Sequence, residues 1–149
     1  MILIRYANKN DAATIARFNS AMAMETENKQ LPSNIVTDGV HTALSNKDYG
    51  FYLLAESDGN PVAQLMITKE WSDWRNGEFW WVQSVYVDKD YRGQGIYRQL
   101  YDKVKELAKA DGNVCGLRLY VDNDNKNAQK TYSKLGMNKT NYILYEEEF

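Results

Sequence analysis

Cysteine, histidine and proline are nearly absent from this sequence. Of its 149 residues, one is Cys, one is His and two are Pro. The single Cys115 cannot form an internal disulfide, which fits a reducing compartment such as the cytoplasm. One His and one Cys cannot supply the usual ligands of a zinc site, and two prolines exclude a proline-rich low-complexity chain. We therefore expect a globular cytoplasmic protein that uses neither disulfides nor a metal.

An excess of positive charge and long apolar runs are also lacking. The net charge is −2 and the isoelectric point about 5.4, whereas nucleic-acid-binding domains are usually strongly basic. No apolar run approaches the roughly 20 residues of a membrane span, and the first residues are charged too early for a signal peptide. We expect no nucleic-acid or membrane partner. The length fits one domain over residues 1–149.

The sequence is rich in tyrosine, and its charged residues are unevenly distributed. Eleven residues are tyrosine, more than a core alone requires. Residues 89–134 hold ten Lys or Arg and six Asp or Glu, so this segment has a charge of +4 against −6 for the rest. Such a separation suits a small polyanionic ligand near the basic segment and a cationic one elsewhere, although chance explains it equally well.

Hydrophobic periodicity and turn residues predict alternating strands and helices. Helices are expected after the capping residues 8–11, from about Ser33, over residues 94–110 and over residues 128–135. We expect strands at residues 2–6, 50–56, 62–68, 78–87 (the longest), 114–121 and 140–149. The order β-α-α-β-β-β-α-β-α-β predicts an α/β fold. Its mixed, twisted sheet would be antiparallel first and parallel at a later crossover, with helices on both faces.

A glycine-rich loop between a strand and a helix is the strongest chemical signal. Residues 92–95 read Arg-Gly-Gln-Gly and connect the strand at 78–87 to the helix at 94–110. Glycines let the backbone approach a ligand, and the helix N-terminus with Arg92 favours a phosphate. The pattern is neither a dinucleotide fingerprint, because Arg98 replaces the third glycine, nor a Walker A loop. The alternative is a plain turn that only caps the helix.

Together with its context, this loop resembles the coenzyme A loop of the GNAT N-acetyltransferase superfamily, Q/R-x-x-G-x-G/A. Arg92 and Gly95 match that pattern, but Tyr97 stands where a small residue is expected. Residues 125–137 resemble a second family pattern, N-x-x-A-x-x-x-Y-x-x-x-G-F/M, with Tyr132 at its tyrosine. The element order extends the resemblance over nearly the whole chain.

The resemblance implies direct acetyl transfer from acetyl-coenzyme A (acetyl-CoA) to a primary amine of a small molecule or peptide. The transfer would occur in a ternary complex without a metal. It implies that the N–H of Val85 polarises the thioester carbonyl, and that Asn125 bonds the pantetheine arm or the neighbouring backbone. Tyr132 would protonate the leaving thiolate, since a phenol is protonated at neutral pH. The implied coenzyme-binding residues are Val85, Tyr86, Val87, Arg92, Gly93, Gln94, Gly95, Ile96, Tyr97 and Asn125.

The general base is less well determined than the coenzyme loop. Glu25 and Glu27 end the first predicted helix, which lines the acceptor side in the family, but they could equally be solvated helix-end charges. Other candidates are Glu70, Asp73, Glu78 and Gln83. Strand alternation is expected to place residues 83, 85 and 87 on one face, where a glutamine could order a water.

Four tryptophans, Trp71, Trp74, Trp80 and Trp81, lie close together in the sequence. They could wall an acceptor site, form a homodimer surface or pack on the sheet. Cys115 is expected in the core.

Two other functions remain open at this level. A non-catalytic acyl-CoA-binding sensor or interaction module needs the same loop but neither Tyr132 nor a base. A nucleotide-binding regulatory domain would use the loop for a different phosphate.

Overall fold

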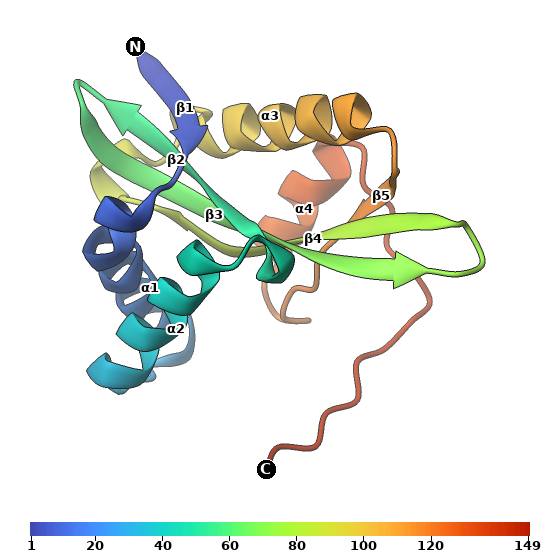
Figure 1. Cartoon of the computed structure of the whole chain (residues 1–149), viewed down its shortest axis with the longest axis horizontal. Coiled ribbons are helices and arrows are strands. Elements are labelled where there is room, and N and C mark those ends of the chain that lie inside the picture. The colour runs from blue at the N-terminus through green and yellow to red at the C-terminus, as the bar shows by residue number, and fades with distance from the viewer. The chain divides into compact units, whose positions relative to one another are not determined.

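A computed structural model describes residues 1–149 (Figure 1). The chain forms two compact units, Met1–Leu119 and Tyr120–Phe149. The second unit contains one helix, α4 (Lys126–Lys134). The first unit contains β1 (Ile2–Tyr6), α1 (Ala12–Glu27), α2 (Ser33–Ser45), β2 (Phe51–Ser57), β3 (Asn60–Ser72), β4 (Gly77–Val87), α3 (Ile96–Asp111) and β5 (Val114–Arg118).

The five strands form one mixed sheet in the order β1-β2-β3-β4-β5. Strands β1 to β4 pair antiparallel, and β5 pairs parallel with β4 after the crossover through α3. The turn between β2 and β3 has positive φ at Asp58 and Gly59, 51° and 78°, which suits a tight hairpin. The mixed α/β sheet predicted from the sequence is confirmed.

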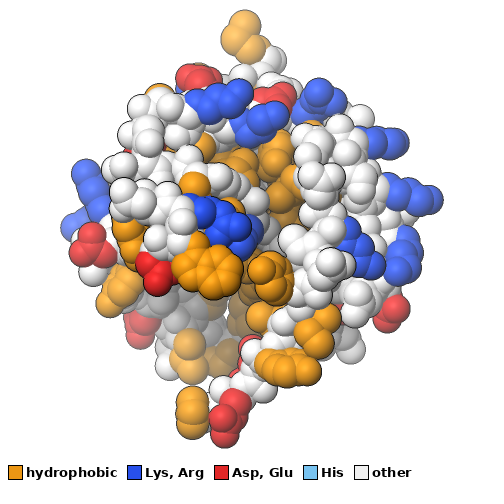
Figure 2. Space-filling view, turned by 90° about the vertical axis from the view of Figure 1, so that its right-hand side faces the viewer, with side chains coloured by type: hydrophobic (Ala, Val, Ile, Leu, Met, Phe, Trp, Pro, Cys, Tyr) orange, Lys and Arg blue, Asp and Glu red, His pale blue; other side chains and the backbone are white.

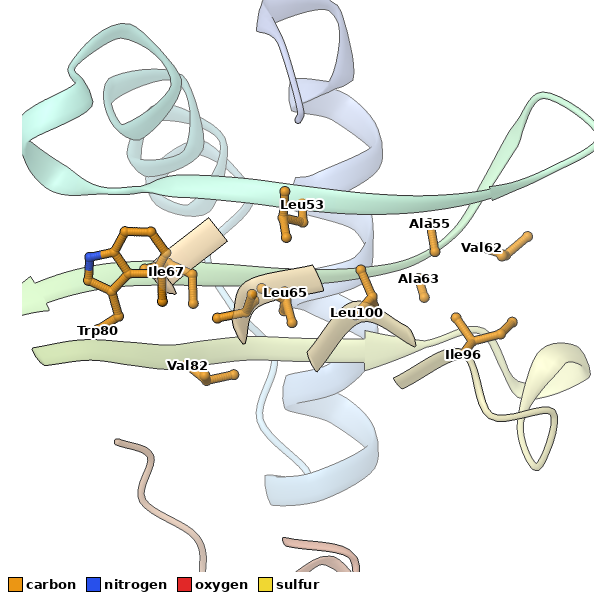
Figure 3. Close-up of a cluster of buried hydrophobic side chains, with 12 residues drawn as sticks. Leu53, Ala55, Val62, Ala63, Leu65, Ile67, Trp80, Val82, Ile96 and Leu100 are labelled. Atoms are coloured by element: carbon orange, nitrogen blue, oxygen red, sulfur yellow. The ribbon is translucent and has the colours of Figure 1, made fainter. Parts of the chain in front are cut away.

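Two hydrophobic clusters cover the two faces of the sheet. On one face, strand side chains pack against Ile96, Leu100 and Val104 of α3, whose spacing forms the apolar stripe predicted for this helix (Figure 3). On the other face, α1 and α2 pack against Tyr52 and Leu54 of β2. Helices therefore pack on both faces of the sheet, as predicted.

The strand predicted over residues 140–149 is absent from the structure. Tyr142, Ile143, Leu144, Tyr145 and Phe149 are all exposed there. A β-strand is stable only with a partner, and an apolar sequence pattern does not provide one. That expectation is wrong, and the observed element order ends at α4.

Two smaller expectations are also corrected. Cys115 is exposed rather than buried in the core, because the register of β5 with β4 shifts at this point and leaves Cys115 without a partner residue in β4. The longest strand is β3, with 13 residues against 11 for β4. None of the helices combines the length and apolar character required to cross a membrane.

Candidate active site

Strands β4 and β5 pair along only part of their length. The last residue pair in their register is Trp81 with Arg118, whereas β4 continues to Val87 beside β3. Beyond Trp81, no strand of the sheet lies on the β5 side of β4. The second half of β4 therefore has backbone groups available to a ligand on that side.

The ladder with β3 indicates which backbone groups of β4 point to this open side. The N–H of Asp88 donates to the carbonyl of Val62 at 2.8 Å, and Tyr86 lies opposite Gln64 in the same register. Residues of an antiparallel ladder bond alternately to one side and the other. Val85 and Val87 therefore direct their N–H groups away from β3, toward the open side.

A β-bulge at Ser84 interrupts the regular alternation of β4. The register with β3 shifts between Gln64 and Met66, and Ser84 has a left-handed φ of 51°. Val85 packs against the cluster beneath α3, whereas Gln83 lies opposite Met66, which packs on the α1–α2 cluster. The expectation that residues 83, 85 and 87 share one face is wrong, because a bulge adds one residue and reverses the order of faces.

A buried glutamine holds this bulge. Gln64 of β3 is fully buried, and its side-chain Nε2 donates to Asn19 Oδ1 at 2.7 Å and to the Ser84 carbonyl at 3.1 Å. Neither Gln64 nor Asn19 was predicted from the sequence. The only signal was a polar residue at the centre of an apolar strand, which periodicity alone does not assign to a site.

The glycine loop forms an exposed turn at the start of α3. Gly93 and Gly95 have φ values of 75° and 74°, and a Cβ at either position would meet no atom within 4 Å. Gly95 is the N-cap of α3 and supplies no side-chain cap. The first N–H groups of the helix are therefore available to an anion, which the helix dipole also favours.

Tyr97, which departs from the family pattern, belongs to the core beneath α3. Its side chain packs against that cluster, and its ring centroid lies 6.3 Å from that of Tyr101. Ile96 is 2% exposed in the same cluster. The bulk of both side chains is therefore directed into the protein rather than into the loop, and only their backbone N–H groups belong to the helix N-terminus.

Arg92 and Glu25, predicted for different roles, form an ion pair. Arg92 Nη2 lies 2.6 Å from Glu25 Oε2, and Arg92 Nε donates to the Val87 carbonyl at 2.9 Å. The hydrogen bond that Arg92 donates to the Glu25 carboxylate raises the pKa of Arg92. Glu27 is exposed, and residues two apart on a helix do not face the same direction. The structure therefore joins Glu25, at the end of α1, to the end of β4 and the glycine loop.

The other carboxylate candidates and the tryptophans are spread over different surfaces. Glu70 accepts a hydrogen bond from Trp81 Nε1 at 2.8 Å and pairs with Arg118 at 3.2 Å. Trp80 is 4% exposed in the core. Trp71 and Trp74 are 60% and 88% exposed near the end of the β3–β4 hairpin. Figure 2 looks onto that end and shows hydrophobic side chains exposed among Lys and Arg. The four tryptophans thus do not form one wall.

The second unit holds the remaining predicted site residues. Asn125 caps α4, since its Oδ1 accepts a hydrogen bond from the N–H of Ala128 at 3.1 Å. This bond is to the neighbouring backbone, one of the two contacts expected of Asn125. A contact of Asn125 with the pantetheine arm stays a prediction. Burial raises the pKa of Tyr132, so its phenol is protonated at neutral pH and can serve as an acid.

Comparisons with known proteins agree with this geometry. The family model for the acetyltransferase (GNAT) family matches residues 18–137. An uncharacterized N-acetyltransferase of Methanocaldococcus jannaschii is 30% identical over 101 residues, which cover 67% of this chain and 44% of that protein. The thialysine N-epsilon-acetyltransferase of Bos taurus is 30% identical over 148 residues, covering 91% of this chain and 83% of the relative.

Solved structures have the same fold. The crystal structure of a possible acetyltransferase from Clostridium difficile 630 superposes with a TM-score of 0.94 at 46% identity and covers 100% of this chain and 98% of its own. A predicted acetyltransferase from Clostridium acetobutylicum, solved with acetyl-CoA, gives a TM-score of 0.81 at 19% identity, with 99% and 96% of the two chains covered. The matched region spans the parted strands, the glycine loop and α4, and the chain belongs to the GNAT acetyltransferase family.

Proposed function

We propose that this protein transfers an acetyl group from acetyl-CoA to a primary amine of a small molecule or peptide, directly and in a ternary complex. The observation that carries the proposal is the parting of β4 from β5 immediately before the open N-terminus of α3. The solved relative from Clostridium acetobutylicum contains acetyl-CoA, which supports the choice of coenzyme.

The coenzyme has two points of attachment in this proposal. Its pyrophosphate is held by the N–H groups at the start of α3, where the two loop glycines leave open space. Its acyl arm runs along the open side of β4, where the N–H of Val85 donates to the thioester carbonyl. A donor directed at the developing oxyanion is worth about 10²–10³-fold in rate.

The acceptor must lose a proton before it attacks. A lysine-like amine has a pKa of about 10.4, so its neutral form costs roughly 4–5 kcal/mol near pH 7. Glu25 is the proposed base, and it takes this role once the phosphates of the coenzyme compete for Arg92. The bovine relative is named for thialysine, and we extend to this chain an acceptor of that chemistry, a flexible side chain with a terminal amine.

Binding and turnover test the proposal separately. Calorimetric titration with acetyl-CoA, coenzyme A, ATP and NAD should show binding of the two coenzyme A species alone. Release of free thiol from acetyl-CoA should then depend on an added amine, with thialysine, spermidine and a lysine peptide as the first acceptors. Binding without turnover on any amine would favour the acyl-CoA sensor, and binding of ATP or NAD alone would favour the nucleotide-binding domain.

Replacement of Tyr132 tests the acid. Tyr132→Phe removes the hydroxyl that would protonate the leaving thiolate, so kcat should fall by about 10²–10⁴-fold, the usual range for general acid catalysis. Affinity for coenzyme A should stay within about twofold. Tyr142→Phe is the matched control, because Tyr142 is 79% exposed. Unchanged turnover in Tyr132→Phe would remove the tyrosine from the mechanism.

A further inference from the structure

The bulge at Ser84 is a strained part of the backbone. Ser84 adopts a φ of 51°, a left-handed conformation that only glycine adopts freely. A residue other than glycine in such a region costs about 1–3 kcal/mol and persists only where its surroundings hold it. Some interaction must therefore stabilise the bulge.

Gln64 provides that interaction from the neighbouring strand. One side-chain nitrogen joins the Ser84 carbonyl, at 3.1 Å, to Asn19 Oδ1 of α1, at 2.7 Å. Asn19 is in turn hydrogen-bonded to Tyr52 of β2. Gln64 itself is 0% exposed, and its Oε1 has no hydrogen-bond partner.

A buried polar group left without a partner costs about 1–3 kcal/mol. An apolar side chain of similar volume would avoid that cost at this position. Stability alone therefore does not explain why a glutamine occupies this position. The two hydrogen bonds that its nitrogen donates point to a role in holding the bulge.

We propose that Gln64 is a positioning residue for catalysis, which holds the β4 bulge so that the N–H of Val85 points at the acyl carbonyl of the bound coenzyme. The proposal rests on the proposed function. Gln64 lies on the face of the sheet covered by α1, whereas Val85 packs beneath α3. Gln64 therefore acts through the backbone of Ser84 and does not contact the coenzyme.

The first experiment replaces the glutamine with an apolar side chain of similar length. Gln64→Met removes both hydrogen bonds, and the bulge should relax toward a regular strand, which turns the N–H of Val85 away from the acyl carbonyl. We expect kcat to fall by about tenfold, which is less than the 10²–10³-fold cost of losing an oxyanion donor outright. The KM for acetyl-CoA should change by less than about threefold, since the phosphate contacts lie elsewhere.

Leu54→Met is the matched control. Leu54 lies opposite Gln64 in the register of β2 and β3, is 0% exposed and packs on the same face. Both substitutions introduce methionine at fully buried neighbouring positions. Leu54→Met should retain kcat within about twofold even where its melting temperature falls as much as that of Gln64→Met. An equal loss of kcat in both variants would overturn the proposal.

A second substitution separates positioning from packing. Ser84→Gly removes the strain of the left-handed conformation, so the bulge should depend less on Gln64. The loss of kcat caused by Gln64→Met should therefore shrink from about tenfold to about threefold or less in the Ser84→Gly background. An undiminished loss in that background would show that Gln64 does not act through the bulge.

A binding measurement needs no acceptor and keeps the proposal separate from the proposed function. Acetyl-CoA has the carbonyl that meets Val85, and coenzyme A lacks it. Wild-type protein should bind acetyl-CoA more tightly than coenzyme A, and Gln64→Met should reduce this ratio whereas Leu54→Met should not. If wild-type protein binds neither, the proposed function fails. If it binds and turns over acetyl-CoA but Gln64→Met keeps wild-type kcat and affinity ratio, only the role of Gln64 fails.

Discussion

At the scale of single residues, buried polar side chains fix the backbone of this protein. Asp11, Gln64 and Ser72 are the buried polar or charged residues. Asp11 binds the guanidinium of Arg5 at 2.8 Å and accepts a hydrogen bond from the N–H of Asn8 at 2.7 Å. It thereby joins β1 to the start of α1, as Gln64 joins α1 to the bulge of β4.

Asp11 gives a prediction about acid stability. The hydrogen bond from Arg5 holds the pKa of Asp11 below its ordinary value of 3.8. A lowered folded-state pKa contributes stability above the unfolded-state pKa, and that stability is lost as the pH falls through the folded-state value. Asp11→Asn should lower the free energy of unfolding by about 1–3 kcal/mol at pH 7. The difference from wild type should shrink below about pH 4.

Urea unfolding at several pH values measures this difference. The control is Asp38→Asn, since Asp38 is an exposed residue of α2 and its replacement should change stability by less than about 0.5 kcal/mol. A deficit of Asp11→Asn that stays constant down to pH 2 would show that the carboxylate charge is not what Arg5 stabilises.

At the scale of elements, replacing a glycine with alanine is expected to strain the backbone in the glycine loop and to stabilise it in α2. Gly95 has a φ of 74° with open space where a Cβ would lie, so Gly95→Ala strains the loop by about 1–3 kcal/mol without a clash. Affinity for coenzyme A should fall by about tenfold. Gly39→Ala, inside α2 where a Cβ also meets nothing, should raise stability by about 0.5–1 kcal/mol and leave affinity unchanged.

Calorimetric titration and thermal unfolding of both variants check this pair. Equal coenzyme affinity in Gly95→Ala and wild type would mean that the loop does not bind the pyrophosphate in this conformation. A stability loss in Gly39→Ala would contradict the helix assigned to that segment.

The contact between α1 and the loop gives a third prediction. Glu25→Gln removes a negative charge 2.6 Å from Arg92, so coenzyme A should bind about 3–10-fold more tightly at low salt and less so at high salt. If Glu25 is also the base, kcat should fall by about 10²–10⁴-fold, the usual range for general base catalysis. Glu27→Gln is the control, since Glu27 is exposed. Unchanged affinity would contradict competition for Arg92, and unchanged kcat would exclude Glu25 as the base.

The elements that could be predicted from the sequence are those that have a local sequence pattern of their own. Helix α3 has a regular apolar stripe, and the turn at Asp58 and Gly59 has a characteristic dipeptide, so both are confirmed from local pattern. The bulge at Ser84 has no such signature because it depends on Gln64 in another strand. The strand expected over residues 140–149 failed for the related reason that strand pairing is a long-range interaction.

At the scale of the whole molecule, the loop residues of the candidate site were predicted but their partners were not. The pairing of Arg92 with Glu25 links residues that are 67 positions apart in the chain. Motif spacing assigned each of them a separate role. The end of α1 lies beside the end of β4 only in the folded chain. In the proposed function, Glu25 and the phosphates of the coenzyme therefore compete for Arg92.

The tyrosines, so numerous in the sequence, make the whole protein sensitive to alkali. Burial raises the pKa of Tyr52, Tyr86, Tyr101 and Tyr132 above 10.0. Above pH 10 the unfolded chain loses these phenol protons while the folded chain keeps them. The unfolded state then binds fewer protons, so the free energy of unfolding falls as the pH rises, by up to about 1.4 kcal/mol per pH unit for each tyrosine.

Unfolding by urea between pH 8 and 11.5 should therefore show a constant stability up to about pH 9.5 and a decline above it. Tyr52→Phe should be less stable at pH 8, because it loses the hydrogen bond with Asn19. Its free energy of unfolding should also decline less steeply above pH 10, because one of the four tyrosines no longer titrates. The control is Tyr142→Phe, at a position that is 79% exposed. Its free energy of unfolding should decline above pH 10 as steeply as that of wild type. Parallel declines for all three proteins would mean that Tyr52 ionises as freely in the folded chain as in the unfolded one.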